Sequence, residues 1–409
     1  MDALMLPLPK AWQRVRLGDI LELLTDYHAN GSYELLKNNV TLLKHVDFAI
    51  MIRTTNFENN DFKNDLIYIN KKAYEFLSKS KVFAGDILVN KIANAGTAYF
   101  MPKLNQPVSL GMNLFLLRIK PNYNNFFIFK QIANYERVLK TFANGSATKT
   151  ITKNVIKNLL IPLPPLNEQI AIANILSDVD HYLYSLRALI LKKESVKKAL
   201  SFELLSQRKR LKGFNQAWQR VKVKDFGIII TGSTPLTQIS EYWNGTISWI
   251  TPTDINDNKD IFNSERKITQ KGLATIRMIP KNSVLVTCIA SIGKNAILRV
   301  DGACNQQINA IIPNKDFNAD FVYYLMENNK QYLLGKAGVT ATYIISKQVF
   351  EEIDFFVPKD LNEQIAIANI LSALDSEIIS LKNKKRQFEN IKKALNHDLM
   401  SAKIRVLRK

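Results

Sequence analysis

The sequence predicts an α/β protein with two mixed α/β globular domains and two long helices that pair as an antiparallel coiled coil, related by a pseudo-twofold duplication. Three observations predict this fold: an eleven-residue segment that occurs twice, a heptad pattern downstream of each copy, and a short motif before each globular stretch. A chain of 409 residues also exceeds one ordinary hydrophobic core. We expect globular domains at 1–162 and 214–358, and long helices at 163–213 and 359–409.

The internal repeat is the strongest of these signals. LNEQIAIANIL occurs at 166–176 and again, letter for letter, at 361–371, and KKAL recurs further along at the same spacing of 195 residues. AWQRV occurs at 11–15 and at 217–221. Eleven identical residues do not recur by chance, so the chain is a duplication.

The globular halves have diverged much further than the repeated segments. Residues 85–102 parallel 282–300, and residues 145–155 parallel 338–349. The first pair shares an apolar strand-like run followed by a small polar turn. The second pair shares a loop rich in Gly, Thr and Ser that carries a lysine.

A heptad pattern continues from each repeated segment. The a and d positions of the first helix are Ile172, Leu176, Val179, Leu183, Leu186, Ile190, Lys193, Lys197, Leu200 and Leu204. Those of the second are Ile367, Leu371, Leu374, Ile378, Leu381, Lys385, Phe388, Lys392, Leu395 and Leu399. Eight of ten are apolar in each helix, which favours a coiled coil. The alternative is that each amphipathic helix packs only on its own domain.

The segments around the helices suggest how they begin and how the chain closes. Prolines precede both helices, and Asn167 and Asn362 are candidate N-caps. About 40 helical residues span roughly 60 Å at 1.5 Å each, close to two turns of B-DNA. One copy of AWQRV follows the first helix. The copy that would follow the second helix stands instead near the start of the chain. The sequence therefore resembles a circle cut at one junction, and we expect the two termini to lie close together.

Charge and composition limit the classes of function. Lys and Arg number 56 against 36 acidic residues, and the net charge of +20 favours an anionic partner, either nucleic acid or an acidic membrane surface. No stretch reads as a membrane span or a secretory signal. Cys288 and Cys304 fit no zinc pattern and are interpreted as buried or idle thiols in a reducing cytoplasm.

Motifs for catalysis are missing from the sequence. No G-x-G occurs, so the usual dinucleotide fingerprint and the glycine-rich loop for S-adenosylmethionine are absent. Gly293-Lys294 and Gly335-Lys336 lack the Ser or Thr that completes a P-loop. The four histidines are scattered without H-E-x-x-H, so no metal site is expected.

These features together resemble the specificity subunit of a type I restriction-modification system. The resemblance covers the whole chain and is carried by PLPPLNEQIAIANIL, VPKDLNEQIAIANIL, TGSTP at 231–235, WITPTDI at 249–255, VLVTCIASIGKNAIL at 284–298, CNQQINAIIP at 304–313 and GDILVNKIANAGTAYFMP in the first half. The first half has HANGSYELLKNNV at 28–40 where TGSTP and WITPTDI are expected. Its recognition domain is therefore expected to belong to a different sequence class.

The resemblance implies a non-catalytic cytoplasmic subunit. Each half supplies a target recognition domain that reads one half of a split, asymmetric site in double-stranded DNA. The long helices fix the unread spacer and dock two methyltransferase subunits, and restriction subunits join the complex. S-adenosylmethionine, ATP and magnesium are expected on those partners, with no cofactor and no membrane contact for this chain.

Residue chemistry selects the candidates for DNA contact, because phosphates are bound by Lys, Arg and amides, and base edges by Asn, Gln, Arg, Lys, Ser and Thr. In the first domain the candidates are His28, Asn30, Ser32, Tyr33, Lys91, Asn94, Ser146, Thr148, Lys149 and Thr150. In the second they are Thr231, Ser233, Thr234, Ser291, Lys294, Asn295, Lys336, Thr340, Thr342, Tyr343 and Lys347. The alternative is that these are ordinary polar turns.

Residues near the helices have two readings each. Candidates for contact with partner subunits or within the helix pair are Glu168, Gln169, Ile172, Leu176, Leu183, Glu363, Gln364, Ile367, Leu371 and Ile378. The four polar members alternatively cap the helices or join helix to domain. Trp12 and Trp218 are predicted to pack at domain edges. Candidates for phosphate contact, or for simple solvation, are Arg208, Lys209, Arg210, Lys212, Lys403, Arg405, Arg408 and Lys409.

Two other classes of function compete with this reading. A self-sufficient DNA methyltransferase or nuclease needs a cofactor loop or a paired-carboxylate site, and neither is visible. A coiled-coil scaffold whose globular ends bind proteins is opposed only mildly by the net charge.

Overall fold

The computed structural model describes residues 8–143, 149–256, 258–339 and 342–406. The chain divides into two compact units, Met1–Ser185 with Lys385–Lys409 (unit 1) and Leu186–Lys384 (unit 2). Each unit joins one globular domain to parts of both long helices, α8 (Leu166–Leu205) and α13 (Leu361–Met400). Each unit therefore contains segments from both halves of the duplication.

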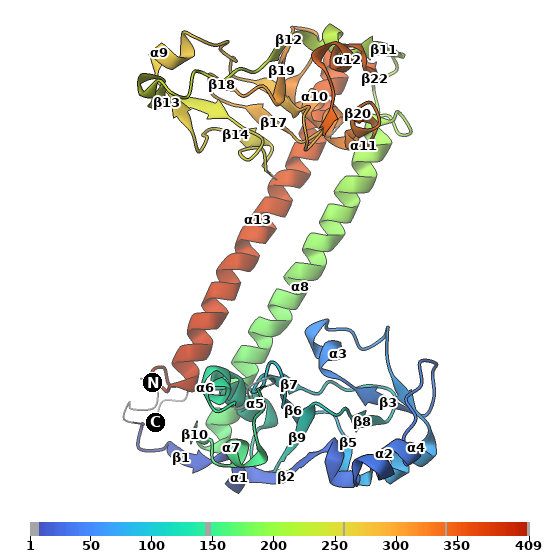
Figure 1. The fold of residues 1–409 in the computed structure, drawn as a ribbon, viewed down its shortest axis with the longest axis vertical. Coiled ribbons are helices and arrows are strands. Elements are labelled where there is room, and N and C mark those ends of the chain that lie inside the picture. The colour runs from blue at the N-terminus through green and yellow to red at the C-terminus, as the bar shows by residue number, and fades with distance from the viewer. Residues whose placement is uncertain (1–7, 144–148, 257, 340–341, 407–409) are drawn as a thin grey trace. The chain divides into compact units, whose positions relative to one another are not determined.

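Unit 1 is a mixed α/β domain with several small sheets (Figure 1). Its strands are β1 (Gln13–Arg16), β2 (Leu21–Asp26), β3 (Ala49–Ile52), β4 (Tyr68–Ile69), β5 (Lys81–Val82), β6 (Ile87–Asn90), β7 (Ala98–Phe100), β8 (Val108–Leu110), β9 (Leu114–Ile119) and β10 (Leu160–Leu163). Its short helices are α1 (Leu17–Ile20), η2 (Tyr27–Asn30), α2 (Tyr33–Asn39), α3 (Thr54–Glu58), α4 (Lys71–Phe76), η3 (Ser78–Ser80), α5 (Asn125–Asn134), α6 (Glu136–Thr141) and α7 (Lys153–Lys157). The strand orders are β1-β10, β2-β9-β6-β7 and β4-β3-β8-β5.

Unit 2 has a domain of the same kind. Its strands are β11 (Trp218–Lys222), β12 (Gly227–Thr231), β13 (Trp243–Ile250), β14 (Asp260–Ile261), β15 (Lys267–Ile268), β16 (Ser283–Thr287), β17 (Asn295–Leu298), β18 (Gly302–Cys304), β19 (Ile308–Pro313), β20 (Gly338–Val339), β21 (Tyr343–Ile344) and β22 (Asp354–Pro358). Its short helices are η4 (Val223–Phe226), η5 (Ser240–Tyr242), α9 (Gln270–Leu273), α10 (Ala319–Asn328), α11 (Lys330–Leu334) and α12 (Lys347–Glu352). The strand orders are β11-β22, β12-β19-β16-β17-β14, β15-β13-β18 and β20-β21.

The two domains share one topology, which confirms the predicted α/β duplication. The order β2-β9-β6-β7 in unit 1 corresponds to β12-β19-β16-β17 in unit 2, with antiparallel neighbours throughout. In each domain a further strand runs parallel to its neighbour, β3 beside β8 and β13 beside β18. The strand-like runs at 85–102 and 282–300, recognised as an echo in the sequence, form the hairpins β6–β7 and β16–β17.

The ends of both long helices lie inside the domain cores. In unit 1, Ile172 and Leu176 of α8 share a buried cluster with Leu399 of α13. In unit 2, Ile367 and Leu371 of α13 share the corresponding cluster with Leu204 of α8. Each helix therefore packs on its own domain at its start and on the other domain at its end, so the alternative in which it packs only on its own domain is wrong.

Between these ends the two helices pair with each other, as the heptads predict. All twenty a and d positions are buried or half-buried. In unit 2, the Lys193 ammonium lies 2.8 Å from the Glu377 carboxylate, and Lys197, one turn further along α8, forms an ion pair with Asp375, which precedes Glu377 on α13. Advancing along α8 thus means going backwards along α13, so the pair is antiparallel.

The predicted N-caps are wrong by position. Both helices begin one residue before Asn167 and Asn362, so these side chains lie within the first turn. The Pro165 carbonyl accepts hydrogen bonds from the first free amides of α8. At α13 the carbonyl and carboxylate of Asp360 accept from the amides of Gln364 and Asn362. In both cases the residue directly before the helix supplies the acceptors.

One helix differs from the expectation that no segment reads as a membrane span. By length and composition, α13 is apolar enough to cross a bilayer. Its apolar first half, however, is the part that fills the core of unit 2, where Ile367, Ala368 and Leu371 are buried. This packing covers part of the apolar stretch, of which 28% is buried.

The two thiols are buried and unbonded, as predicted. Burial raises the pKa of Cys288 and of Cys304 to about 12, so both are protonated at neutral pH. Among the described residues, no group of three or more His, Cys, Asp and Glu is placed to share a metal ion.

Candidate nucleic-acid interface

The candidate loops of each domain meet at one end of its main sheet. In unit 2, Thr231 at the end of β12 pairs with Asn309, which pairs in turn with Val286 near the end of β16. The chain leaves β16 here into the loop that holds Ser291 and Lys294. In unit 1 the corresponding pairs are Asp26 with Phe115 and Phe115 with Val89. The register therefore brings separate polar loops to one edge.

Backbone bridges join these loops in the same way in both domains. Ile92 pairs with Thr150 in unit 1, and Ile289 pairs with Ile344 in unit 2. The turns beside them use left-handed residues at matching places, Ala93 and Gly96 in one, Ala290 and Gly293 in the other. The Gly/Thr/Lys loops singled out in the sequence thus lie against the loops that follow β6 and β16.

The candidates of unit 1 divide into exposed side chains and structural ones. His28, Ser32, Tyr33, Asn94, Lys149 and Thr150 are exposed. Ser32 also caps α2 by accepting from the Leu35 amide. Asn30 is a structural residue because its amide donates to Ser80 Oγ at 2.9 Å while its oxygen accepts from the Lys79 amide.

Lys91 belongs to a half-buried charge cluster. Its ammonium lies 3.3 Å from the Asp26 carboxylate, which Lys153 also approaches at 3.0 Å. Burial alone raises the pKa of Asp26, but the hydrogen bonds and charges of the two lysines outweigh it and lower that pKa below its usual value. The cluster fixes β2 against the two loops and leaves little of Lys91 exposed, which does not favour direct contact with DNA.

The candidates of unit 2 are mostly exposed. Lys294, Lys336, Thr342, Tyr343 and Lys347 are exposed, whereas Thr231, Ser233, Thr234 and Ser291 are half-buried. Thr231 donates to the Asn309 side chain at 2.7 Å, and Thr234 donates to Gln306 at 2.6 Å.

Asn295 does not fit its predicted role. It is 3% exposed and its amide donates to the Tyr323 carbonyl at 2.8 Å, because it lies on β17 rather than in the loop before it. Three other candidates, Ser146, Thr148 and Thr340, lie outside the described residues.

A buried glutamate at the start of each long helix holds the ends of its unit together. In unit 1, the Arg405 guanidinium donates two hydrogen bonds to the Glu168 carboxylate, at 2.6 and 2.9 Å, and the Trp12 indole donates a third at 3.2 Å. Glu168 is 2% exposed. The segments next to both termini therefore meet at one carboxylate, which confirms the expected closure for the described residues.

Unit 2 repeats this latch with equivalent residues. Arg210 donates to Glu363 at 3.3 and 2.9 Å, and Trp218 donates at 3.3 Å. Arg210 precedes Arg405 by the repeat spacing of 195 residues. We call these two three-residue clusters the latches. Because their arginines bind buried carboxylates, the expected phosphate contact does not fit Arg210 or Arg405, whereas edge packing of both tryptophans is confirmed.

The glutamines beside the latches join helix to domain. Gln169 accepts a hydrogen bond from the Asn124 amide at the start of α5, and Gln364 accepts one from the Asn318 amide at the start of α10. Both side chains are at most 2% exposed. The remaining seam candidates are likewise buried: Ile172, Leu176, Ile367 and Leu371 in domain cores, and Leu183 and Ile378 outside them.

A second repeated cluster lies where the long helices meet the domain helix. In unit 1, the Asp180 carboxylate pairs with Lys130 of α5 at 2.8 Å and with Lys392 of α13 at 2.5 Å. Burial raises the pKa of Asp180, but the two lysines more than offset this and lower it below the usual value. Asp180 was not among the residues predicted from the sequence. The signal that could have identified it is that an aspartate recurs 195 residues later, at Asp375.

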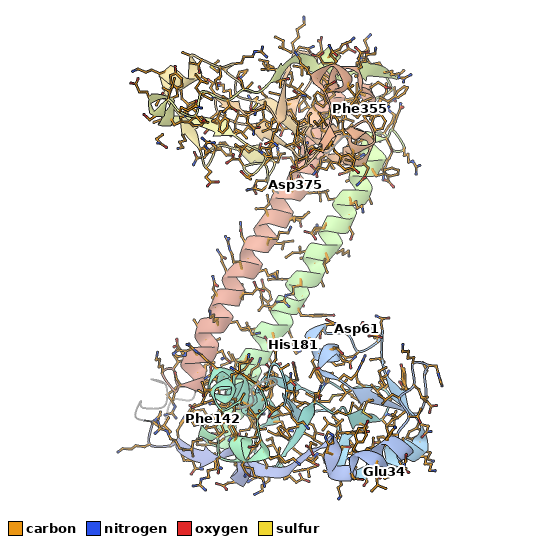
Figure 2. The ribbon with its side chains drawn as sticks, in the orientation of Figure 1. Glu34, Asp61, Phe142, His181, Phe355 and Asp375 are labelled. Atoms are coloured by element: carbon orange, nitrogen blue, oxygen red, sulfur yellow. The ribbon has the colours of Figure 1, made fainter. Side chains whose placement is uncertain are left out.

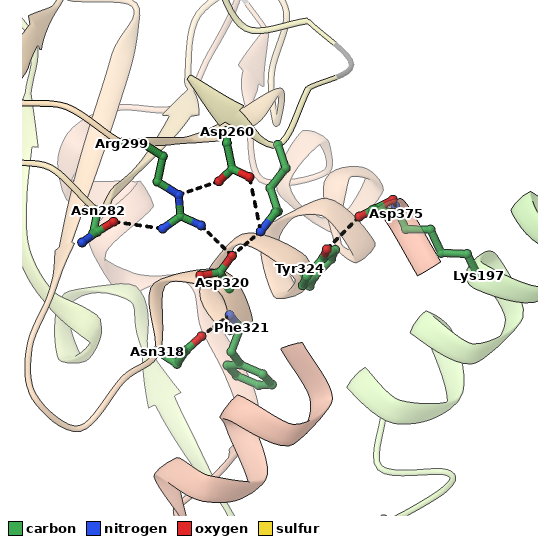
Figure 3. A network of polar contacts seen from close by, with 10 residues as sticks. Lys197, Asp260, Asn282, Arg299, Asn318, Asp320, Phe321, Tyr324 and Asp375 are labelled. Atoms are coloured by element: carbon green, nitrogen blue, oxygen red, sulfur yellow. Dashed lines mark hydrogen bonds and ion pairs between the residues drawn. The ribbon is translucent and has the colours of Figure 1, made fainter. Parts of the chain in front are cut away.

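In unit 2 the same three positions are Asp375 (labelled in Figure 2), Tyr324 and Lys197, and Figure 3 shows all three together. The Tyr324 hydroxyl donates to Asp375 at 2.7 Å, and Lys197 forms an ion pair with the same carboxylate. Burial, and then the Asp375 charge, raises the pKa of Tyr324. Beside this cluster, Arg299 links Asp260 and Asp320 at 2.5 and 2.7 Å and secures β17 to α10.

A crevice adjoins each of these clusters. The crevice of unit 2 has a volume of about 810 Å³ and is lined by Glu194, Lys197 and Lys198 of α8. That of unit 1, of about 730 Å³, is lined by their equivalents Glu389, Lys392 and Lys393. The duplication has therefore kept the same concave surface in both units.

Comparison with known proteins explains why these features occur in pairs. The model of the type I restriction modification DNA specificity domain matches residues 9–194 and again residues 215–390. The chain belongs to the type I restriction-modification specificity family. The two matches coincide with the two recognition domains and the helices that follow them.

Individual relatives support the same assignment. A putative type I restriction enzyme MjaX specificity subunit from Methanocaldococcus jannaschii is 28% identical, over 98% of this chain and 95% of the relative. The MjaIX specificity subunit of the same organism is 36% identical, but over only 43% of this chain and 41% of the relative. The crystal structure of a type I S subunit from M. genitalium shares the fold, with a TM-score of 0.60 at 16% identity over 97% of this chain and 98% of that one.

Family membership fixes the general role. Specificity subunits are DNA-recognition components rather than enzymes, and they act in complexes with methyltransferase subunits, restriction subunits and DNA. The sheet-edge loops described above keep the same backbone arrangement in both halves of this specificity subunit but carry different side chains.

Proposed function

We propose that this specificity subunit reads a bipartite, asymmetric site in double-stranded DNA, one half with each recognition domain. One observation carries the proposal: two domains with one topology present unlike polar loops at the same sheet edge. The first offers His28, Tyr33 and Lys149, and the second offers Lys294 and Tyr343. Because base edges are read by side chains, different loops on one framework recognise different half-sites.

The test replaces one reading domain and leaves the other in place. Residues 1–160 are exchanged for the recognition domain of another specificity subunit, and methylated adenines are mapped in cells that also carry the cognate methyltransferase. We expect one half of the methylated motif to change and the other half and the spacer to persist. A change in both halves, or in neither, contradicts the proposal.

We propose further that the long helices dock two methyltransferase subunits, and that restriction subunits join this complex. Exposed positions that are identical in both helices support two equivalent docking surfaces. Asn167, Ile170 and Asn174 are exposed on one face of α8, and Asn362, Ile365 and Asn369 repeat them on α13, where the two asparagines are exposed and Ile365 is half-buried. Packing explains why buried positions are identical in α8 and α13. It does not explain the identity of the exposed positions, since the recognition domains have diverged.

The docking surfaces can be tested by a charged substitution in each. The double variant Ile170→Glu with Ile365→Glu is expected to weaken copurification of the cognate methyltransferase subunit at least tenfold, because it places a carboxylate on each surface, and tenfold corresponds to about 1.4 kcal/mol. The control is Ile391→Glu, at an isoleucine of α13 that is 49% exposed, against 42% for Ile170, and where α8 has a valine. Equal binding of the double variant and the control contradicts these surfaces.

The chemistry of the complex is assigned to the partners. We propose that S-adenosylmethionine, ATP and magnesium bind the methyltransferase and restriction subunits, and that this chain works in the cytoplasm without a cofactor of its own. The lack of G-x-G, P-loop and H-E-x-x-H motifs in the sequence supports this division.

A further inference from the structure

The small lobe of the second recognition domain contains an arginine on an aromatic platform. Trp243 and Trp249, both on β13, lie perpendicular to each other with ring centroids 5.1 Å apart. The Arg266 guanidinium carbon lies 4.1 Å from the centroid of the first ring and 4.9 Å from that of the second. Contact with two indoles fixes the plane of the guanidinium before any ligand arrives.

The platform is anchored on a loop that already carries three DNA-contact candidates. The Trp249 indole donates to the Ser233 carbonyl at 3.0 Å, and the Trp243 indole donates to the Leu236 carbonyl at 3.2 Å. Both rings are nearly buried, with Ile268 and Ala303 packed beside them. The position of Arg266 is thereby tied to the loop that holds Thr231, Ser233 and Thr234.

The guanidinium itself has no polar partner among the described residues. Arg266 is exposed, and only its backbone carbonyl takes part in hydrogen bonds with other described residues, from Ser264 and Trp249. The half-buried arginines of the described residues, Arg53, Arg118, Arg210 and Arg299, are each paired with a carboxylate. The Arg266 guanidinium therefore presents oriented N–H donors that no carboxylate of the described residues occupies. Such donors suit a planar hydrogen-bond acceptor on another molecule.

The first domain offers a different arrangement at its small lobe. Lys81 lies 4.5 Å from the Tyr74 ring, but it is already paired with Glu75 at 2.8 Å. Lys71 lies 6.0 Å from the Phe48 ring. An ammonium is a point charge and lacks the planar fork, so the two lobes present different chemistry.

We infer that Arg266 is a specificity-determining residue of the second recognition domain and reads the O6 and N7 edge of a guanine. The inference rests on the proposed function. The bidentate pairing of arginine with guanine is the commonest specific contact in the major groove, and a fork held flat by two indoles makes it with little loss of side-chain entropy.

The test compares Arg266→Lys and Arg266→Gln in the full subunit with its cognate methyltransferase. Arg266→Lys keeps a cation on the two indoles, so its effect is not attributable to misfolding caused by losing the charge. Arg277→Gln, at an exposed arginine in the same lobe, is the matched control. Adenine methylation is mapped, and binding to the mapped duplex is measured at several salt concentrations. We expect both variants to lose about ten- to a hundredfold of their discrimination at one G·C position, in one half of the motif only.

Each outcome decides the matter. An unchanged motif with unchanged affinity overturns the inference. Uniformly weaker binding with an unchanged motif and a salt slope reduced by about one marks a phosphate contact and also overturns it. If the wild-type complex shows no sequence-specific binding or methylation at all, the proposed function fails instead, and that result is distinct from both.

Discussion

Arg405→Met is expected to destabilise unit 1 by about 3 kcal/mol. The substitution leaves the Glu168 carboxylate 2% exposed and held only by the Trp12 indole. Removing one partner of a buried ion pair typically costs about 3 to 5 kcal/mol, and the lower end applies because the Arg405 side chain is 35% exposed. Hydrogen exchange of the amides in β1, β10 and the first turns of α8 measures the loss.

Two further variants separate the latch from general effects of charge. Glu168→Gln combined with Arg405→Met keeps an acceptor for Trp12 without burying a charge, so the double variant is expected to be more stable than Arg405→Met alone. Lys403→Met removes a nearby exposed cation and is expected to leave exchange unchanged. A loss below about 1 kcal/mol for Arg405→Met, equal to that of Lys403→Met, contradicts a stabilising role for the latch.

Gly227→Ala is expected to unfold the second recognition domain. Gly227 begins β12 at a φ of +154°, and a Cβ built there lies 1.9 Å from the Ile312 carbonyl oxygen. Since β12 and β19 pair through this contact, the strands must separate to admit a methyl group. The expected cost is at least about 4 kcal/mol, in the range that only exceptional substitutions reach.

A second glycine in the same unit provides the comparison. A Cβ at Gly335 has its nearest neighbours at 3.5 Å, so Gly335→Ala is expected to change stability by no more than about 0.5 kcal/mol. Exchange protection of β19 and β16 reports on unit 2, and protection of β9 provides a reference in unit 1. Retained protection of β19 in Gly227→Ala shows that the sheet tolerates the methyl group and that this steric argument is wrong.

The helices and the duplication were predictable from the sequence because heptads and identical segments are local patterns. All twenty predicted a and d positions are buried or half-buried, although contacts within the pair also use other positions, such as Tyr182 against Phe388. The exact helix starts were not predictable, since Asn167 is a good capping residue and only the backbone of the preceding turn excludes it. The burial of the helix ends in domain cores depends on tertiary contacts such as that of Ile172 with Leu399, which no local pattern reveals.

The candidate site was predictable as loops but not as individual side chains. Residue type marked both Lys294 and Asn295 as DNA contacts, yet Lys294 is exposed in the loop and Asn295 is buried, because it begins β17, whose four residues are all buried. Arg266 escaped notice because its platform is formed by two tryptophans six residues apart on a bulged strand. The latches escaped notice because their three residues come from separate parts of the chain.

The core of unit 1 is completed by Leu399 and Met400, and that of unit 2 by Leu204 and Leu205, so each half lends a helix end to the other. Two identical half-length chains could make these same contacts as an isologous homodimer, in which each chain gives its helix end to the core of the other. Such a dimer reads only palindromic DNA sites, because its twofold symmetry requires two identical half-sites. Covalent fusion of the halves removes this restriction, since each copy is then free to accumulate its own substitutions and the ligand no longer has to be symmetric.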